Sequence, residues 1–432
     1  MDEILRKPAP GLKGVWACVL AAFILTASPV TAWGAVCDIV LPLDDEIGDG
    51  DDDGDVINDD MPQPCGMVGN PINLISGNKF QEEVDYTGKG VSAINLKRVY
   101  NSYDGIWRHN YSDNLSIGQF VITYVRADGT RHVFLKKNFS PLYGATGKLS
   151  SSGSGYLHTA TDGSQMTFDS AGKLTSIKDA EGRIQTLTYS ANNTVTVRNV
   201  FGHTLVMTLG MLSQLTSAKV GGISITYNYA ANATRMTSLS KVVDGKTLTR
   251  QYHYEVPNAD RLLTGITDER GVRFATWKYD NGERAISSEH AGGVESSTLN
   301  YNDGMSTTVT NELGRQTTYK FKTIYYSRRI VEIIGEPTPS CPYSNSKFEY
   351  DKKGRLSAKI DSMGARSEYY YNDRDLLVRT VVAVGTAVSK ETLTEWHATF
   401  PKPVKVTTPT SITTYSYDAQ GRLINTSVVS RV

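Results

Sequence analysis

Many of the motifs that mark enzymes and metal sites are missing from this sequence of 432 residues. There is no HExxH pair, no GxSxG, no P-loop and no GxGxxG, and the seven histidines show no paired spacing. An excess of one charge is missing too, because 45 lysines and arginines balance 45 aspartates and glutamates. The basic residues are also scattered, which disfavours nucleic acid as a partner. We therefore expect a protein that is not an enzyme.

Long apolar runs are scarce, and the one near the N-terminus is short. It spans 15–25, follows three basic residues and leads into small residues, an order that is typical of a secretory signal peptide. We expect cleavage after Ala32 or Ala35, which predicts a secreted, periplasmic or cell-surface protein. A retained membrane anchor is the alternative, but the run is shorter than the roughly 18–20 apolar residues that a span needs. No stable membrane span is therefore expected after cleavage.

Cysteine is rare, and no CxxC or Cys/His cluster indicates zinc. Cys18 leaves with the signal peptide, so three cysteines remain in the exported chain. Export permits a disulfide, and Cys37 and Cys65 stand on either side of an acidic segment that such a bond could staple. Cys341 is then left over, either as a free buried thiol or with a partner elsewhere.

The acidic segment contains eleven acidic residues and no basic residue between positions 38 and 60. From position 61 onward the chain therefore carries 42 lysines and arginines against 32 aspartates and glutamates, a surplus of ten positive charges. A run of like charges repels itself and stays extended, so a solvated, disordered linker is one interpretation.

Calcium binding is the other interpretation of this segment. Acidic residues alternate, Gly54 permits a sharp turn among them, and an acidic residue stands in the twelfth place, which matches the EF-hand loop pattern. The pattern resembles the calcium loops of dockerins and thrombospondin type 3 repeats, although only one copy is present and no helical pattern flanks it. The candidate calcium ligands are Asp49, Asp51, Asp53, Asp55 and Asp60.

Helical periodicity is also missing after the N-terminus. The chain alternates between segments rich in Tyr, Thr and Val and short breaks rich in Gly, Asn and Asp. This alternation predicts many short β-strands and an all-β protein.

Three similar words stand at the breaks: FDSAGKL at 168–174, YDKKGRL at 350–356 and YDAQGRL at 417–423. In each, an aromatic residue precedes Asp, and Gly follows three places later. Asp at the first place and Gly at the fourth favour a type I turn, in which Asp binds the backbone ahead and Gly takes the left-handed conformation. We therefore expect each word to encode a β-hairpin rather than a catalytic site.

The breaks and the aromatic residues recur at regular distances. Gly182, Gly202 and Gly222 are twenty residues apart. Aromatic or large apolar residues recur as i, i+2 pairs behind such glycines, and side chains two apart in a strand share one face of a sheet. The aromatic pairs are Tyr227 and Tyr229, Tyr252 and Tyr254, Trp277 and Tyr279, Tyr319 and Phe321, Phe348 and Tyr350, Tyr369 and Tyr371, and Tyr415 and Tyr417.

This pattern, an aromatic residue two places before Tyr-Asp-x-x-Gly-Arg-Leu, resembles the YD repeats of RHS proteins, bacterial relatives of the teneurins and of insecticidal toxin-complex shells. GNPINLISGNKFQEEVDYTGKG at 69–90, LKRVYNSYDG at 96–105 and YVRADGTRHVF at 124–134 look like the entry domain that precedes the repeats in many RHS proteins. The resemblance covers 66–432. It implies antiparallel hairpins that join edge to edge into a partial or spiralling β-shell.

The resemblance also implies a domain order. The predicted segments are a signal peptide (1–35), an acidic linker with a possible calcium loop (36–65), an RHS entry domain (66–150), YD repeats (151–321), an insertion or loop (322–346) and further YD repeats (347–432). No Asp-Pro pair of the kind found in the family's self-cleaving core is present, so we expect the array to end without a core or toxin domain.

Two functions follow as expectations. One is a secreted structural shell in a toxin-delivery or polymorphic toxin system, non-enzymatic itself, whose partner would be a toxin domain or a downstream RHS segment. The other is an extracellular repeat protein that binds polysaccharide or a cell surface through exposed aromatics and the positive surplus. A carboxylate pair for glycoside hydrolysis is disfavoured, because most aspartates already have a role in turns.

Overall fold

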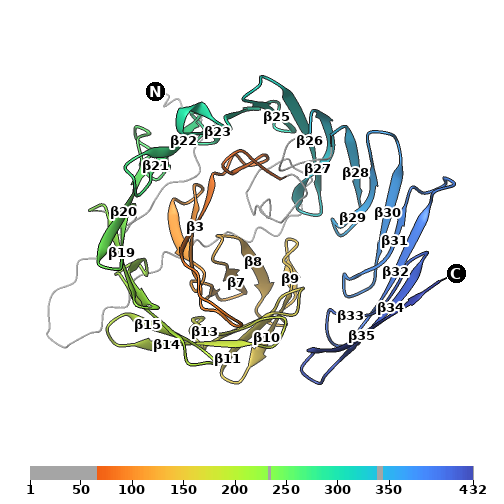
Figure 1. Ribbon diagram of the computed structural model, residues 1–432, viewed down its shortest axis with the longest axis horizontal. Coiled ribbons are helices and arrows are strands. Elements are labelled where there is room, and N and C mark those ends of the chain that lie inside the picture. The colour runs from red at the N-terminus through yellow and green to blue at the C-terminus, as the bar shows by residue number, and fades with distance from the viewer. Residues whose placement is uncertain (1–65, 232–234, 338–343, 432) are drawn as a thin grey trace, which may run out of the picture. The chain divides into compact units, whose positions relative to one another are not determined.

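The computed structural model describes residues 66–231, 235–337 and 344–431, all within one compact unit of the chain, residues 49–432. These residues form β-strands and turns, with one short 3₁₀ segment, η1 (Ala291–Gly293), and no α-helix among them (Figure 1). No helix in this part of the chain is long and apolar enough to cross a membrane. The all-β prediction is confirmed.

Three small antiparallel sheets come first in the described chain. They pair β1 with β2, β3 to β5, and β6 to β9. The strands are β1 (Met67–Val68), β2 (Ile72–Asn73), β3 (Phe80–Tyr86), β4 (Leu96–Asn101), β5 (Ile106–His109), β6 (Asn114–Ile117), β7 (Val121–Val125), β8 (Arg131–Leu135) and β9 (Pro141–Leu142).

The remaining strands form one antiparallel sheet of 26 strands, in which each strand pairs with its neighbours in chain order. They are β10 (Lys148–Ser152), β11 (Gly155–Thr159), β12 (Gln165–Phe168), β13 (Leu174–Lys178), β14 (Ile184–Ser190), β15 (Thr194–Asn199), β16 (Thr204–Leu209), β17 (Leu215–Val220), β18 (Ile223–Tyr229), β19 (Met236–Val243), β20 (Lys246–His253), β21 (Gly265–Thr267), β22 (Arg273–Tyr279), β23 (Ala285–His290), β24 (Ser297–Tyr301), β25 (Ser306–Asn311), β26 (Gln316–Ile324), β27 (Ser327–Gly335), β28 (Ser346–Tyr350), β29 (Leu356–Ile360), β30 (Arg366–Tyr371), β31 (Leu377–Val382), β32 (Lys390–Trp396), β33 (Pro403–Thr407), β34 (Ser411–Tyr417) and β35 (Leu423–Ser430). The sheet is open, because β10 and β35 end it. This confirms the predicted array of hairpins.

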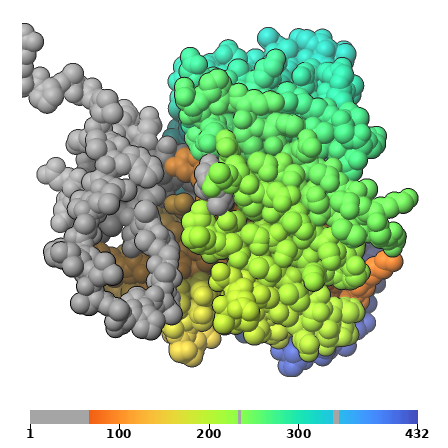
Figure 2. Space-filling model, turned by 90° about the vertical axis from the view of Figure 1, so that its left-hand side faces the viewer, coloured from red at the N-terminus to blue at the C-terminus, as the bar shows by residue number. Residues whose placement is uncertain are grey.

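The alternation along the strands gives this sheet two different faces. We call the face that carries Tyr227, Trp277 and Tyr319 the inner face, and these three side chains are buried. The sheet curves around β3, β7 and β8, which lie on its inner side (Figure 1). On the side of the molecule shown in Figure 2, the outer face of the middle strands of the sheet forms a continuous surface. Because side chains two residues apart share a face, one face of the hairpins from β14 to β29 contributes buried residues to the core.

The turns of the sheet form two rims. We call the rim at which even-numbered strands lead into odd-numbered ones the YD rim, since the three words lie there, and the other one the opposite rim. A Cβ placed on Gly163, on the opposite rim, would lie 3.0 Å from Pro401 Cγ on the YD rim. A Cβ on Gly182 would lie 3.9 Å from the Gln420 carbonyl oxygen in the same way. The last hairpins therefore meet the first hairpins rim to rim, as the coils of a spiral do.

The prediction of an insertion or loop over 322–346 is wrong for its first part. β26 continues to Ile324, and β27 follows after a turn of only two residues. Those two residues, Tyr325 and Tyr326, have φ values of 49° and 62°. A two-residue hairpin turn needs positive φ at both places, usually supplied by Asn and Gly. The sequence pattern does not indicate this hairpin, because two tyrosines occupy the places where Asn and Gly are usual.

Candidate functional site

The predicted calcium ligands, Asp49, Asp51, Asp53, Asp55 and Asp60, lie outside the described residues. The predicted signal peptide lies outside them as well. Within the described ranges, no group of three or more His, Cys, Asp or Glu side chains is arranged to hold a metal ion. Calcium binding therefore stays a prediction that belongs to the acidic segment.

The aspartate of each repeated word organises its own turn. In YDKKGRL, Asp351 Oδ1 accepts from the N–H groups of Lys353 at 2.9 Å and Arg355 at 3.0 Å. The N–H of Gly354 donates to the Asp351 carbonyl, and Gly354 has a φ of 73°. Asp418 makes the same contacts in YDAQGRL, and Asp169 makes them in FDSAGKL. The predicted hairpin role of the words is confirmed.

The basic residue of the word also has two contacts. Arg355 Nε donates to Asp351 Oδ2 at 2.7 Å, and its guanidinium lies 4.7 Å from the ring centroid of Tyr371 in the next hairpin. Arg284 repeats both contacts, with Asp280 and with Tyr301. The word thus stabilises its own turn and holds the next hairpin through a cation–π contact.

In most hairpins, a tyrosine forms a hydrogen bond with the backbone of the hairpin before it. Tyr371 donates its hydroxyl hydrogen to the carbonyl of Leu356, the leucine of YDKKGRL, at 2.9 Å. The same bond recurs along the array with hydroxyl–carbonyl distances of 2.6–2.9 Å, and Trp396 Nε1 replaces the hydroxyl once. The other pairs are Tyr189 with Leu174, Tyr229 with Leu215, Tyr279 with Leu263, Tyr301 with Ala285, Tyr350 with Ile330 and Tyr417 with Pro403. The chain is a repeat protein of interlocked β-hairpins.

A buried ion pair joins the first sheets to the inner face. Arg98 donates to both carboxylate oxygens of Asp85, at 2.6 Å and 2.9 Å, and these side chains are 1% and 4% exposed. Tyr252 and Tyr227 complete the network: Arg98 donates to the first hydroxyl, and the second donates to Asp85. Burial alone would lower the pKa of Arg98, but Asp85 and the Tyr252 hydroxyl outweigh it and hold the pKa well above its usual value.

A second buried basic side chain, Lys79, also joins the first sheets to the inner face. Lys79 is fully buried, and its Nζ donates to the carbonyls of Asn70 and Phe80 and to Gln81 Oε1 at 2.5–2.8 Å. The ammonium also lies 4.1 Å from the ring centroid of Trp277 on the inner face. Burial lowers the pKa of Lys79 well below its usual value, with a smaller opposing effect from Glu83. These contacts position the first sheets rather than expose a reactive amine.

Sequence reasoning missed this network, although a signal was present. Leu96, Arg98 and Tyr100 alternate along one strand, and all three are at most 1% exposed. A charge between two large apolar residues at i±2 shares their face. That position indicated a buried arginine, but nothing in the sequence named Asp85 as its partner.

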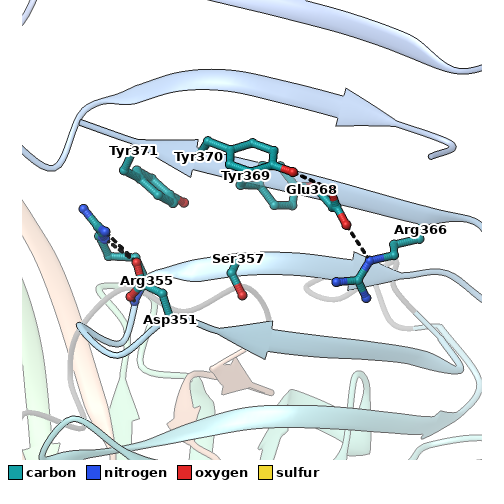
Figure 3. Close-up of a pocket in the computed structure, with 8 residues that line it drawn as sticks. All are labelled: Asp351, Arg355, Ser357, Arg366, Glu368, Tyr369, Tyr370 and Tyr371. Carbon is teal, nitrogen blue, oxygen red and sulfur yellow. Dashed lines mark hydrogen bonds and ion pairs between the residues drawn. The ribbon is translucent and has the colours of Figure 1, made fainter. Parts of the chain in front are cut away.

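An open pocket of about 400 Å³ lies beside the turn of YDKKGRL and strands β29 and β30 (Figure 3). Its lining is Asp351, Arg355, Ser357, Arg366, Glu368, Tyr369, Tyr370 and Tyr371. Alternation in β30 places Glu368 and Tyr370 on the face opposite Tyr369 and Tyr371, so the lining of this pocket includes residues from both faces of the strand.

The charged groups of this pocket are engaged in ion pairs. Arg366 binds Glu368 and also Glu349 across β29, and Tyr370 donates to Glu368 at 2.6 Å. The hydrogen bonds from Tyr370 and from Arg366 hold the pKa of Glu368 below its usual value. The arrangement stabilises three adjacent strands and offers no unpaired acid or base in this pocket.

One part of the chain matches a known protein family. Residues 69–134 match the protein family described as "Domain of unknown function (DUF6531)". The match lies inside 66–150, the segment that resembles an RHS entry domain, and its description assigns no activity. No curated protein matches the chain.

Two similar solved structures are toxin-complex components. A crystal structure described as TcdB2-TccC3-Cdc42 is 11% identical, with 83% of this chain and 20% of that chain covered and a TM-score of 0.33. A Tc holotoxin pore of Photorhabdus luminescens is 12% identical, with 81% and 20% covered and a TM-score of 0.31. The chain therefore spans about a fifth of the length of these solved chains. At such TM-scores the likeness carries no argument about function.

Proposed function

We propose that this chain is a secreted structural wall in a bacterial toxin-delivery system, and that it catalyses no reaction itself. The carrying observation is the interlocked array, in which the repeated aspartate, arginine and tyrosine each bind the turn or the neighbouring hairpin. Because these side chains bind one another and the backbone, they stabilise the wall and are not available for catalysis. The resemblance of the words to RHS repeats supplies the delivery role and a toxin domain as partner.

The covering of the inner face supports an enclosing role. Tyr252 and Trp277 are buried against residues of the first sheets, Trp107 and Lys79, whereas Tyr369 and Tyr371 further along the array are only half-buried. A sheet whose inner face is partly covered by its own chain has room on the rest for another polypeptide.

A reporter fusion tests both parts of the proposal. β-Lactamase joined after position 432 should appear outside the cytoplasm of an exporting bacterium. It should also resist added protease longer than the same reporter joined after position 150, where the large sheet is missing. A reporter that stays in the cytoplasm would contradict secretion. An exported reporter with equal protease sensitivity in both fusions would contradict the wall.

Binding of an extracellular polysaccharide is a second candidate, favoured by the half-buried aromatics on the inner face. Tyr369, Tyr371 and Trp396 present partly open rings on adjacent hairpins, and such rings stack on sugar faces. The surplus of ten positive charges from position 61 onward favours an anionic glycan. A glycan array with the purified chain should give hits that Tyr369→Ala abolishes, while the outward-facing Tyr370→Ala serves as control. An array without hits rejects this candidate.

A further inference from the structure

Residues 143–147 connect β9 to β10 and so join the first sheets to the large sheet. Two histidines, one from each side of this junction, bind Thr146 within the connection. The Thr146 N–H donates to His132 Nδ1 of β8 at 3.1 Å, and the Thr146 carbonyl oxygen lies 3.3 Å from His158 Nε2 of β11. We call residues 143–147 together with these two histidines the histidine latch.

The two bonds to Thr146 determine where each ring carries its hydrogen. A carbonyl oxygen can only accept, so His158 carries a hydrogen on Nε2 and its Nδ1 is left for a lone pair. A backbone N–H can only donate, so the Nδ1 of His132 carries no hydrogen either. Both rings are therefore neutral while the latch is closed.

Protonated rings do not fit these surroundings. Each ring is 4% exposed, their centroids are 6.4 Å apart, and the rings of Tyr124 and Phe134 lie against the pair. A proton on His132 Nδ1 would face the N–H of Thr146, so that two donors oppose each other. The Nδ1 of His158 is buried and has no partner among the described residues, so a proton there would find no acceptor. Two charged rings would also repel each other.

The charged groups of the β7–β8 turn do not compensate for this. Burial lowers the pKa of His132 to about 4 and also lowers the pKa of His158, and the charge of Arg126 adds to both effects. Asp128 has the opposite, smaller effect on the pKa of His132, but its carboxylate is paired with Arg126 at 3.3 Å. Neutral rings are thus the stable state of the closed latch.

Asp113 is a second carboxylate beside the cluster, and it is engaged as well. One of its oxygens accepts from the Tyr124 hydroxyl, and the other accepts from the Ala127 N–H at 2.7 Å. In the part of the chain that the structure describes, no carboxylate bonds to the ring of His132 or His158. Proton uptake at these rings therefore requires that the cluster opens.

The backbone of the latch is strained while it is closed. Tyr143 has a φ of 50°, a left-handed value that is unfavourable for an aromatic residue. Gly147 has a φ of 77°, and a Cβ there would lie 2.5 Å from His158 Nε2, so this close approach requires a glycine. Strain of this kind persists only while the surrounding contacts hold the segment, so it favours opening once the histidine bonds break.

We propose that the histidine latch is an acid-sensitive switch, which is closed at neutral pH and opens when both rings take up a proton. Opening breaks both bonds to Thr146 and separates the connection from β8 and β11. Because this connection joins the sheet of β6–β9 to the large sheet, its release loosens the covering of the inner face where the large sheet begins. The switch goes beyond the proposed wall and holds whether or not the wall encloses a cargo.

Hydrogen exchange of the full chain between pH 7.5 and pH 5 tests the switch, with each rate corrected for the intrinsic effect of pH on exchange. Amides of 131–135, 143–147 and 155–159 should lose protection about 100-fold per pH unit between about pH 6.5 and 5, because opening takes up two protons. Amides of β18, which contains no histidine, should lose far less protection.

Variants without titrating rings separate the latch from other effects of acid. His132→Asn combined with His158→Gln keeps an acceptor at the first place and a donor at the second. This double variant should keep its protection at 143–147 down to pH 5. If it does not fold, His158→Gln alone should reduce the loss to about 10-fold per pH unit, because one titrating ring remains. Near-UV circular dichroism at pH 7.5 shows whether each variant is folded.

His109→Asn is the matched control. His109 is equally buried and its pKa is also lowered to about 4 by burial, but its ring binds the Tyr111 N–H instead of Thr146. This variant should therefore lose protection at 143–147 as steeply as the unmodified chain.

Three results would overturn the switch. The first is protection at 143–147 that does not change between pH 7.5 and pH 5. The second is an equal loss of protection in the unmodified chain and in the folded variants of His132 and His158. The third is a loss of the same size in β18, which would mean that acid unfolds the whole sheet rather than opening the latch.

Discussion

At the residue scale, the structure separates charges that stabilise single turns from charges that join distant segments. Arg183 and Asp179 form an exposed pair, 38% and 35% exposed, within one turn. Arg98 and Asp85 form a buried pair in contact with two tyrosines of the large sheet. Solvent screens the first pair, whereas removal of one partner from the second leaves a charge in an apolar surrounding.

Arg98→Met is therefore expected to destabilise the fold by about 3–5 kcal/mol, because Asp85 loses its counter-ion. Chemical unfolding followed by tryptophan fluorescence measures the change, since Trp107 lies 4.8 Å from the Arg98 guanidinium. Arg183→Met should cost no more than about 1 kcal/mol. The double change Arg98→Met with Asp85→Leu should recover stability. Equal effects of the two arginine changes would refute the buried-pair interpretation.

Two glycines of repeated turns offer a second test at this scale. Gly172 and Gly364 have φ values of 83° and 81°, so alanine strains either backbone by about 1–2 kcal/mol. A Cβ at Gly364 meets open space, but at Gly172 it would lie 2.0 Å from the Leu115 carbonyl oxygen of β6. Gly172→Ala should lower the melting temperature clearly more than Gly364→Ala. Similar shifts would mean that the contact between β6 and this turn is dispensable.

At the element scale, two buried histidines accept hydrogen bonds from the backbone of segments that follow them. His109 Nδ1 accepts from the Tyr111 N–H, and His132 Nδ1 accepts from the Thr146 N–H. Burial lowers the pKa of each to about 4, and for His132 the charge of Arg126 adds to this effect. Protonation of either ring would remove the acceptor that holds its segment.

The sign of the resulting pH dependence follows from these shifts. The unfolded chain binds protons at these histidines below a pKa of about 6.5, while the folded chain resists protonation down to about 4. Stability is thus fully present above pH 6.5 and falls as the pH drops toward 4, by up to ~3 kcal/mol for each ring. Urea unfolding between pH 7.5 and 4.5 measures this slope. His132→Asn keeps an acceptor without a titrating ring and should flatten it; an unchanged slope would contradict the assignment.

At the scale of the whole molecule, stability is distributed unevenly along the array. The strands from β15 to β27 contribute buried aromatics and aliphatics to one continuous core. β33 has only half-buried residues, and β35 has only exposed ones. Local opening costs least where few apolar contacts break.

Hydrogen exchange should therefore show a gradient along the large sheet. Amides of β15–β27 are expected to be the slowest to exchange, and those of β31–β35 faster by at least an order of magnitude. Peptide-level mass spectrometry of the full chain gives this comparison within one sample. Uniform protection from β15 to β35 would show that the inner face of the last strands is covered in solution.

The sequence pattern predicted the structure correctly where a side chain interacts with residues next to it in the chain. Asp351 and Gly354 were predicted as turn residues, and they are, because an Asp–backbone bond and a positive φ depend only on local geometry. It failed at Tyr325 and Tyr326, which form a tight turn without the usual turn residues. The Tyr371–Leu356 bond was not foreseen either, because it requires the strand register of β29 and β30.

The sequence by itself determined the all-β class, the hairpin words and the face on which the aromatics gather, since these depend on contacts within a few residues. Only the tertiary structure decided that the sheet curves around its own first strands, that Arg98 finds Asp85 and two distant tyrosines, and that the two rims meet. The physical reason is that the two-residue period of a strand determines which face of the sheet each side chain occupies, but not how the sheet curves. Curvature arises when twisted hairpins pack against a shared core.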